Sequence, residues 1–168
     1  EQVTHDEDLG IVNGQAVHRV EFGINKGLFW SPESKKLAYY RMDETMVTDY
    51  PLVDINSRIA EVQNTKYPMA GMTSHEVTLM VYNLENDESI AIKTEGPADQ
   101  FLTAVTWGPN GEFIYIGILN REQNHLKLNK YNASTGEFVT QLFEEKSSKY
   151  VEPENGLYFL KSNKDHFI

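Results

Sequence analysis

The stretch Leu28-Phe29-Trp30-Ser31-Pro32-Glu33-Ser34-Lys35-Lys36-Leu37-Ala38-Tyr39-Tyr40 decides the fold. Its apolar start ends at Ser31-Pro32, where proline fixes φ and serine can bond the local backbone. The aromatic-rich residues 37–42 then favour a returning β-strand. The stretch therefore predicts two antiparallel strands that are joined by a tight turn.

The same pattern occurs a second time. Val105-Thr106-Trp107-Gly108-Pro109 precedes a turn, which is followed by Phe113-Ile114-Tyr115. In both copies an apolar residue, any residue, Trp, a small residue and Pro lead into a turn. The turn is followed by an apolar residue, any residue and Tyr. A further pair of predicted strands follows each copy, at residues 79–84 with 90–92 and at residues 126–131 with 138–139. Each unit therefore holds four antiparallel strands, and a third unit starts near Leu157.

Repeated four-stranded units predict an all-β fold, namely antiparallel blades of a partial β-propeller with about two to three blades. The blade units cover about residues 11–42 plus 76–93, and then 101–143, within one domain of residues 1–168. Residues 43–71 lack a clear period and contain Pro51, so we expect an insertion arm there. The alternative that the pattern leaves open is an antiparallel sandwich of about 12 short strands.

The composition excludes several functional classes. Among 168 residues, 25 acidic and 15 basic side chains give a net charge of −10, which disfavours nucleic acid and anionic membranes as partners. The absence of cysteine excludes disulfides, zinc–thiolate sites and a thiol nucleophile. No apolar run approaches the ~20 residues that span a bilayer. The chain shows no signal peptide and lacks an initial methionine, so we expect a fragment of a longer protein.

No motif for a metal, a phosphate group or a catalytic triad is present in the sequence. The five histidines lack His-x-x-x-His spacing, and neither a Gly-x-Ser-x-Gly elbow nor a phosphate-binding glycine motif occurs. We therefore expect no cofactor, no metal and no catalytic residue in this chain. The acidic residues at positions 1–8 are expected to be a solvated end. Asp43 and Glu44 are expected to be turn residues or ion-pair partners of Arg41.

Glu21 lies in a segment that the pattern describes as strand and turn. Asn13-Gly14 predicts a tight hairpin turn, and residues 16–20 predict a short strand that ends just before Glu21. Composition alone makes Glu21 a surface carboxylate.

Five motifs, in this order, resemble one known family and together span nearly the whole chain. They are Glu21-Phe22-Gly23-Ile24, Phe29-Trp30-Ser31-Pro32, Leu37-Ala38-Tyr39-Tyr40-Arg41-Met42-Asp43-Glu44, Tyr67-Pro68-Met69-Ala70-Gly71 and Tyr150-Val151-Glu152-Pro153. The set is similar to the propeller domain of dipeptidyl peptidase IV and prolyl tripeptidyl peptidase, in the prolyl oligopeptidase clan. The resemblance is closest to bacterial members of the Bacteroidetes type.

The resemblance implies a function for Glu21. The family joins an N-terminal eight-bladed propeller to a C-terminal α/β-hydrolase domain, and propeller glutamates bind the N-terminal ammonium of the peptide by charge-assisted hydrogen bonds. Glu21 matches the second glutamate of the family's adjacent pair, while Val20, preceded by Arg19, stands where the first would be. The implied function is a non-catalytic, substrate-gating segment of a serine exopeptidase of the post-proline type. The resemblance leaves open whether the enzyme releases dipeptides or tripeptides.

The resemblance also implies partners and a location. The partners are the N-terminus of a peptide substrate, the α/β-hydrolase domain of the same parent chain, and a second copy bound through an arm at residues 45–66. The implied location is the periplasm or the cell envelope, or outside the cell. The alternative function is a stand-alone propeller-type module that binds proteins and has no link to a peptidase.

Overall fold

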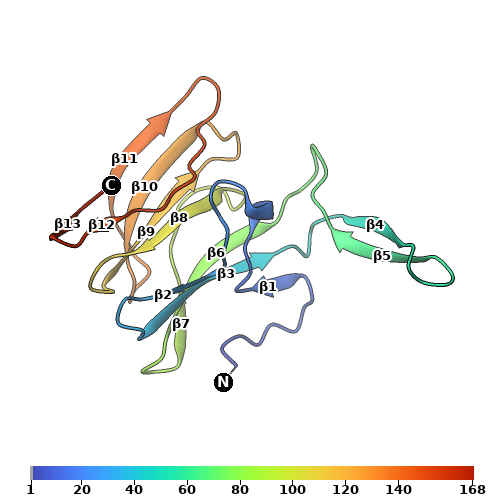
Figure 1. Ribbon diagram of the computed structural model, residues 1–168, viewed down its shortest axis with the longest axis horizontal. Coiled ribbons are helices and arrows are strands. Elements are labelled where there is room, and N and C mark those ends of the chain that lie inside the picture. Colours follow the sequence, from blue (N-terminus) through green and yellow to red (C-terminus); the bar gives the residue numbers. More distant parts are fainter. Residues whose placement is uncertain (1) are drawn as a thin grey trace.

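The computed structural model describes residues 2–168, and β-strands dominate it (Figure 1). Among these residues the only helical element is one short 3-10 turn, so the predicted all-β, antiparallel class is confirmed. In the described part of the chain, no helix is long and apolar enough to cross a membrane.

The first sheet contains the opening stretch of the sequence. Its strands, all paired antiparallel, are β1 (Ile11–Asn13), β2 (Leu28–Trp30), β3 (Lys36–Asp43), β6 (Glu76–Asn83) and β7 (Glu88–Ala91). Both β1 and β2 pair with the same edge of β3, since residues 11–13 oppose 43–41 and residues 28–30 oppose 39–37. The two short strands therefore act as one edge strand that is interrupted by residues 14–27.

The second sheet is a simple antiparallel meander. It consists of β8 (Phe101–Trp107), β9 (Phe113–Leu119), β10 (His125–Asn132) and β11 (Phe138–Lys146). The register between β8 and β9 shifts between Thr103 and Thr106, where Ala104 has a φ of 53°. This bulge bends β8 at the point where it faces the interrupted edge of the first sheet.

One hydrophobic core joins the two sheets. The alternating apolar side chains of β6 and β9 face it, as their period of two requires. Its buried members are Val17, Ile24, Phe29, Ala38, Tyr40, Val77, Leu79, Val81, Ile92, Leu102, Trp107, Ile114, Ile116, Ile118, Tyr131 and Ala133. Two buried hydrogen bonds cross this core, from Trp107 Nε1 to the Phe29 carbonyl and from the Tyr40 hydroxyl to the Leu102 carbonyl.

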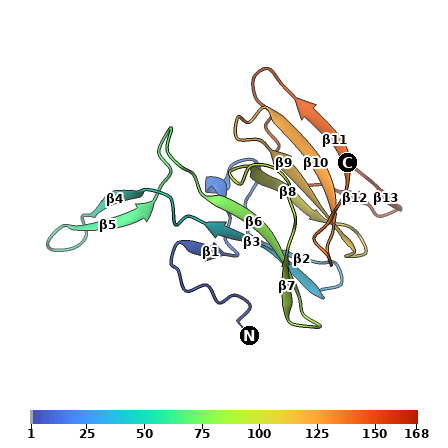
Figure 2. The ribbon, with the colours of Figure 1, turned by 180° about the vertical axis from the view of Figure 1, so that it is seen from behind.

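Residues 49–66 form a hairpin that projects away from both sheets, as the two opposite views agree (Figures 1 and 2). Its strands are β4 (Asp49–Asp54) and β5 (Glu61–Lys66). Regular strands were not predicted here, because Pro51 argues against a central strand. A two-stranded ribbon has a free edge on each strand, so it tolerates the missing N–H of a proline.

The chain ends in a second small hairpin, β12 (Phe159–Leu160) with β13 (Asn163–Phe167). Phe159 and Phe167 pack on Tyr115 of β9, with ring centroids 5.2 and 6.2 Å from the tyrosine ring. Tyr115 alternates with the core-facing residues Ile114 and Ile116, so this hairpin covers the opposite face of the second sheet.

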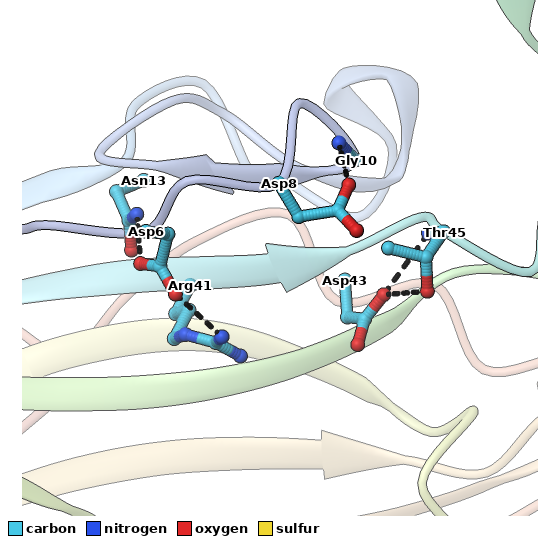
Figure 3. Close-up of polar contacts among 7 residues, drawn as sticks. All are labelled: Asp6, Asp8, Gly10, Asn13, Arg41, Asp43 and Thr45. Atoms are coloured by element: carbon cyan, nitrogen blue, oxygen red, sulfur yellow. Dashed lines mark hydrogen bonds and ion pairs between the residues drawn. The ribbon is translucent and has the colours of Figure 1, made fainter.

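Of the acidic residues at positions 1–8, Asp6 is attached to the first sheet rather than only solvated (Figure 3), while Glu1 lies outside the described residues. Asp6 accepts hydrogen bonds from Arg41 Nη2 at 2.7 Å and from Asn13 Nδ2 at 2.8 Å, and both contacts lower the pKa of Asp6. Of the two alternatives expected for Asp43 and Glu44, the ion pair with Arg41 does not form, because Arg41 pairs with Asp6. Asp43 instead accepts hydrogen bonds from the N–H and hydroxyl of Thr45, which confirms its expected place in a turn.

Candidate functional site

Glu21 lies in a loop whose two ends meet at one residue of β3. We call residues 14–27 the Glu21 loop. The N–H of Gly14 donates to the Tyr40 carbonyl at 2.8 Å, and the N–H of Tyr40 donates to the Gly27 carbonyl at 3.1 Å. A Cβ on Gly27 would stand 2.1 Å from the Gln15 carbonyl oxygen, so the neck of the loop closes only with glycine at this position. The segment is a compact Ω-type loop inserted into an edge strand.

Residues His18–Val20 form the 3-10 turn η1 rather than the predicted strand. The φ angles of His18, Arg19 and Val20 are 52°, 56° and 60°, which is a left-handed conformation in three successive residues other than glycine. A strand could not form because β1 and β2 already occupy the available edge of β3. Left-handed residues of this kind cost on the order of 1–3 kcal/mol each and persist only where their surroundings hold them.

Two buried histidine rings, one of them in this turn, lie against each other. The ring of His18 is buried, its Nδ1 lies 2.9 Å from Nε2 of the buried His75, and it meets the ring of Phe101 edge-on at 4.7 Å. Burial, with additional repulsion from His75 and Arg121, lowers the pKa of His18 to about 3. Burial also lowers the pKa of His75. Both rings are therefore neutral at pH 7.

The residues after Glu21 seat the loop on the second sheet. The Phe22 ring packs on Phe101 at 4.8 Å, and the Phe22 carbonyl accepts a hydrogen bond from the hydroxyl of the buried Thr103. Gly23, with a φ of 70°, lies so close to the backbone of Glu154 that a Cβ would stand 2.1 Å from its carbonyl oxygen. Glu21 is therefore held between the turn and the segment that precedes β12.

An open pocket of about 440 Å³ lies beside Glu21. Its lining residues are Glu21, Phe22, Phe101, Arg121, Gln123, Glu152, Pro153 and Glu154. Within residues 2–168, none of the four charged side chains in this lining makes an ion pair or a hydrogen bond through its charged group. The guanidinium of Arg121 instead stacks 5.5 Å from the centre of the Phe101 ring.

The charges of this pocket determine what it can bind. Three unpaired carboxylates and one guanidinium leave a net negative site, which favours a cationic group. A carboxylate held at the mouth of such a pocket can accept two or three charge-assisted hydrogen bonds from an ammonium group. No cluster of metal-ligating side chains occurs in the described part of the chain.

Sequence reasoning named one of the four charged residues in this pocket. Arg121 was missed because it lies in a polar turn between two strands, where no spacing distinguishes it from a solvated residue. Glu152 belongs to a motif that carried the family resemblance, but no role was attached to it. Val20, at the position of the family's first glutamate, is 63% exposed and adds no polar group.

The whole chain matches one family model. The model for the dipeptidyl peptidase IV (DPP IV) N-terminal region matches residues 1–168. The chain belongs to this family. The family resemblance seen in the sequence is thus confirmed.

Relatives in the DPP IV family include fungal enzymes. A protein named probable dipeptidyl-aminopeptidase B from Talaromyces marneffei is 30% identical in an alignment of 158 positions, which covers 82% of this chain and 18% of the relative. A protein named dipeptidyl-aminopeptidase B from Aspergillus niger is 28% identical in an alignment of 160 positions, which covers 84% of this chain and 18% of the relative. The chain thus spans about a fifth of the length of the curated relatives it matches.

Two bacterial DPP IV crystal structures are similar in three dimensions. A protein from Bacteroides ovatus, described as a dipeptidyl aminopeptidase IV, superimposes with a TM-score of 0.94 at 53% identity, over 99% of this chain and 23% of that one. Porphyromonas gingivalis dipeptidyl peptidase 4 superimposes with a TM-score of 0.86 at 25% identity, over 97% of this chain and 24% of that one.

Proposed function

We propose that this chain is the non-catalytic propeller segment of a serine exopeptidase that releases N-terminal di- or tripeptides after proline, and that Glu21 binds the N-terminal amine of the substrate. The observation that carries the proposal is the free carboxylate of Glu21 at the edge of a negatively charged pocket. Membership of the DPP IV family supplies the link to a peptidase. The catalytic groups would belong to an α/β-hydrolase domain of the same parent chain.

The chemistry of the pocket supports an amine ligand. A free peptide N-terminus is an ammonium group with three donors, and carboxylates are its natural acceptors. Glu152 and Glu154 add negative charge near Glu21, while Arg121 is a donor suited to carbonyl or carboxylate oxygens further along a peptide. An anchored amine would fix how far the peptide reaches into the enzyme and would exclude blocked or internal sequences. This is the sense in which the propeller gates the reaction.

The test uses the full-length protein with Ala-Pro and Ala-Ala-Pro p-nitroanilides, each with a free and with an acetylated amine. Glu21→Gln removes one charge-assisted bond, on the order of 2–3 kcal/mol, so kcat/KM for the free-amine substrates should fall about 30- to 150-fold. Glu145→Gln, on the exposed strand β11, is the matched control and should leave kcat/KM unchanged. Unchanged kinetics in Glu21→Gln would refute the anchor, and the preferred substrate length separates dipeptide from tripeptide release.

We further propose that the arm at residues 45–66 helps two copies of the full-length protein to associate. The hairpin exposes an unusual number of apolar side chains for a solvated ribbon, namely Tyr50, Leu52, Val53, Ile55, Ile59 and Val62. Such patches mark association surfaces. Replacement of residues 50–65 by two glycines should convert a dimer to a monomer in sedimentation velocity, and a dimer that survives the deletion would exclude the arm.

We also propose that the full-length protein lies in the periplasm, in the cell envelope or outside the cell, as its similarity to the peptidase family suggests. Cell fractionation with an antibody against this segment tests the location. Recovery in the cytoplasmic fraction would contradict it.

A further inference from the structure

The turn that precedes Glu21 needs an external support. The residues His18, Arg19 and Val20 have left-handed φ angles, and Val20 is β-branched and largely exposed, so its own burial stabilises little. The backbone bonds of the turn run from Val20 N to the Val17 carbonyl at 3.2 Å and from Glu21 N to the His18 carbonyl at 3.1 Å. The second bond makes the direction in which Glu21 leaves the turn depend on the position of His18.

His18 is the buried side chain of this turn, and its ring has one polar partner among residues 2–168. Its Nδ1 meets His75 Nε2 at 2.9 Å, whereas its Nε2 is buried without a hydrogen bond. The two rings also lie 4.6 Å apart and tilted, and Phe101 closes the other side of His18. Rotation or displacement of His18 would therefore break its single polar contact.

His75 is attached to the first sheet. It directly precedes β6, a central strand of the first sheet that pairs with β3 along eight residues. The attachment to β6 restricts where His75 Nε2 can lie, and the contact of this nitrogen with His18 Nδ1 restricts the position of the turn in the same way. A bond of this kind needs one N–H and one lone pair, so at least one ring must be unprotonated at the contact. Arg121 and Arg19 lie near the pair and oppose a second proton. Both histidines line a small cavity that lies outside the Glu21 pocket, and Lys66 and Glu44 are further charged residues in its lining.

We propose that His18 and His75 are positioning residues, which act through their ring-to-ring contact to hold the left-handed turn and thereby to aim the carboxylate of Glu21 into the pocket. This inference rests on the proposed amine-binding function of Glu21. Neither histidine lines the pocket itself. Their effect can therefore reach Glu21 through the backbone between His18 and Glu21, or through the ring of Phe101, which contacts His18 and lines the pocket.

The experiment measures amine selectivity in the full-length protein, defined as kcat/KM for Ala-Pro p-nitroanilide divided by kcat/KM for its acetylated form, and the same ratio for Ala-Ala-Pro p-nitroanilide. His75→Phe keeps an aromatic ring but removes the donor or acceptor. It should lower the ratio about tenfold or more, because misplacement of a binding group by about 1 Å has effects of this size. His75→Gln offers an amide near the position of Nε2 and should restore most of the ratio. His125→Gln, on β10 and bonded to Glu144, is the control and should leave the ratio unchanged.

A general loss of structure would weaken the reaction of both forms of the substrate and would leave their ratio intact. If His75→Phe does not fold, His18→Gly carries the same test, because glycine accepts the φ of 52° while the ring is lost. The double variant His75→Phe with Glu21→Gln should be no less selective than Glu21→Gln alone.

The outcomes separate the two proposals. An unchanged ratio in His75→Phe, or in His18→Gly, together with a reduced ratio in Glu21→Gln overturns the positioning role and keeps the amine anchor. An unchanged ratio in Glu21→Gln overturns the anchor itself.

Discussion

The indole nitrogen of Trp107 donates a hydrogen bond to the carbonyl oxygen of Phe29 at 2.8 Å, which joins the second sheet to the first through their equivalent repeat segments. Trp107 is buried, whereas Trp30 at the same place in the first repeat is 55% exposed. The two tryptophans thus share a sequence pattern but differ in surroundings.

Trp107→Phe should destabilise the 168-residue chain by about 1–3 kcal/mol, because the buried Phe29 carbonyl loses its only side-chain donor in the described structure. Trp30→Phe is the same change at an exposed site and should stay within about 0.5 kcal/mol. The free energy of unfolding from urea titration measures both. Equal effects at the two positions would contradict the role of the Trp107 bond.

Gly23→Ala should destabilise the chain more than Gly71→Ala. Both glycines have a positive φ, 70° and 76°, so both substitutions strain the backbone by about 1 kcal/mol. A Cβ at residue 71 meets nothing within 4 Å, whereas one at residue 23 meets the backbone of Glu154. The added overlap should contribute about 1–3 kcal/mol more. Equal urea midpoints for the two variants would contradict this prediction and would show that the backbone at Glu154 moves aside at little cost in free energy.

Stability should fall as the pH drops below 6.5. The folded-state pKa of His18 is about 3, well under its ordinary value of 6.5, and that of His75 is lowered in the same direction. Between these values the unfolded chain binds more protons than the folded chain, so protons favour unfolding by up to about 1.4 kcal/mol per pH unit for each histidine. Chemical denaturation from pH 7 to pH 5 measures the slope. His75→Phe should give a shallower slope than the parent chain, and an identical slope would be inconsistent with a buried neutral pair.

Val20→Gly should stabilise the chain. Val20 is 63% exposed with a φ of 60°, so glycine relieves strain and loses little burial. The relief of about 1–2 kcal/mol exceeds the entropic penalty of glycine, which is about 0.5–1 kcal/mol. Val53→Gly, at a 59% exposed strand position with no positive φ, relieves nothing and should not stabilise. Thermal unfolding of both variants and of the parent chain measures the effect. A Tm for Val20→Gly below that of the parent chain would refute the strain at Val20.

The strands were predictable where side chains alternate and turn residues flank them. The two repeated segments around Trp30 and Trp107 predicted β2, β3, β8 and β9, because the apolar faces of these strands pack into one core. The turn at His18–Val20 was not predictable, because residues 16–20 have the pattern of a strand, while β1 and β2 already fill the edge of β3 where such a strand could pair. Arg121 and Glu152 could not be joined to Glu21 from the sequence, because they are about 100 and 131 positions away and meet only through tertiary packing. The arm hairpin was missed because its pairing depends on a free edge that tolerates Pro51.

The neck at Tyr40 makes the register of the sheet independent of the length of the Glu21 loop. Because the loop leaves and returns through the two backbone groups of a single residue, an insertion or deletion within it changes neither the pairing of β1 nor that of β2. The alternation of inward and outward side chains is then preserved on both sides of the graft. Loops of other lengths, with other ligand-binding residues, can be exchanged at this neck without a change in strand register, provided that they supply the apolar side chains that Val17 and Ile24 contribute to the core.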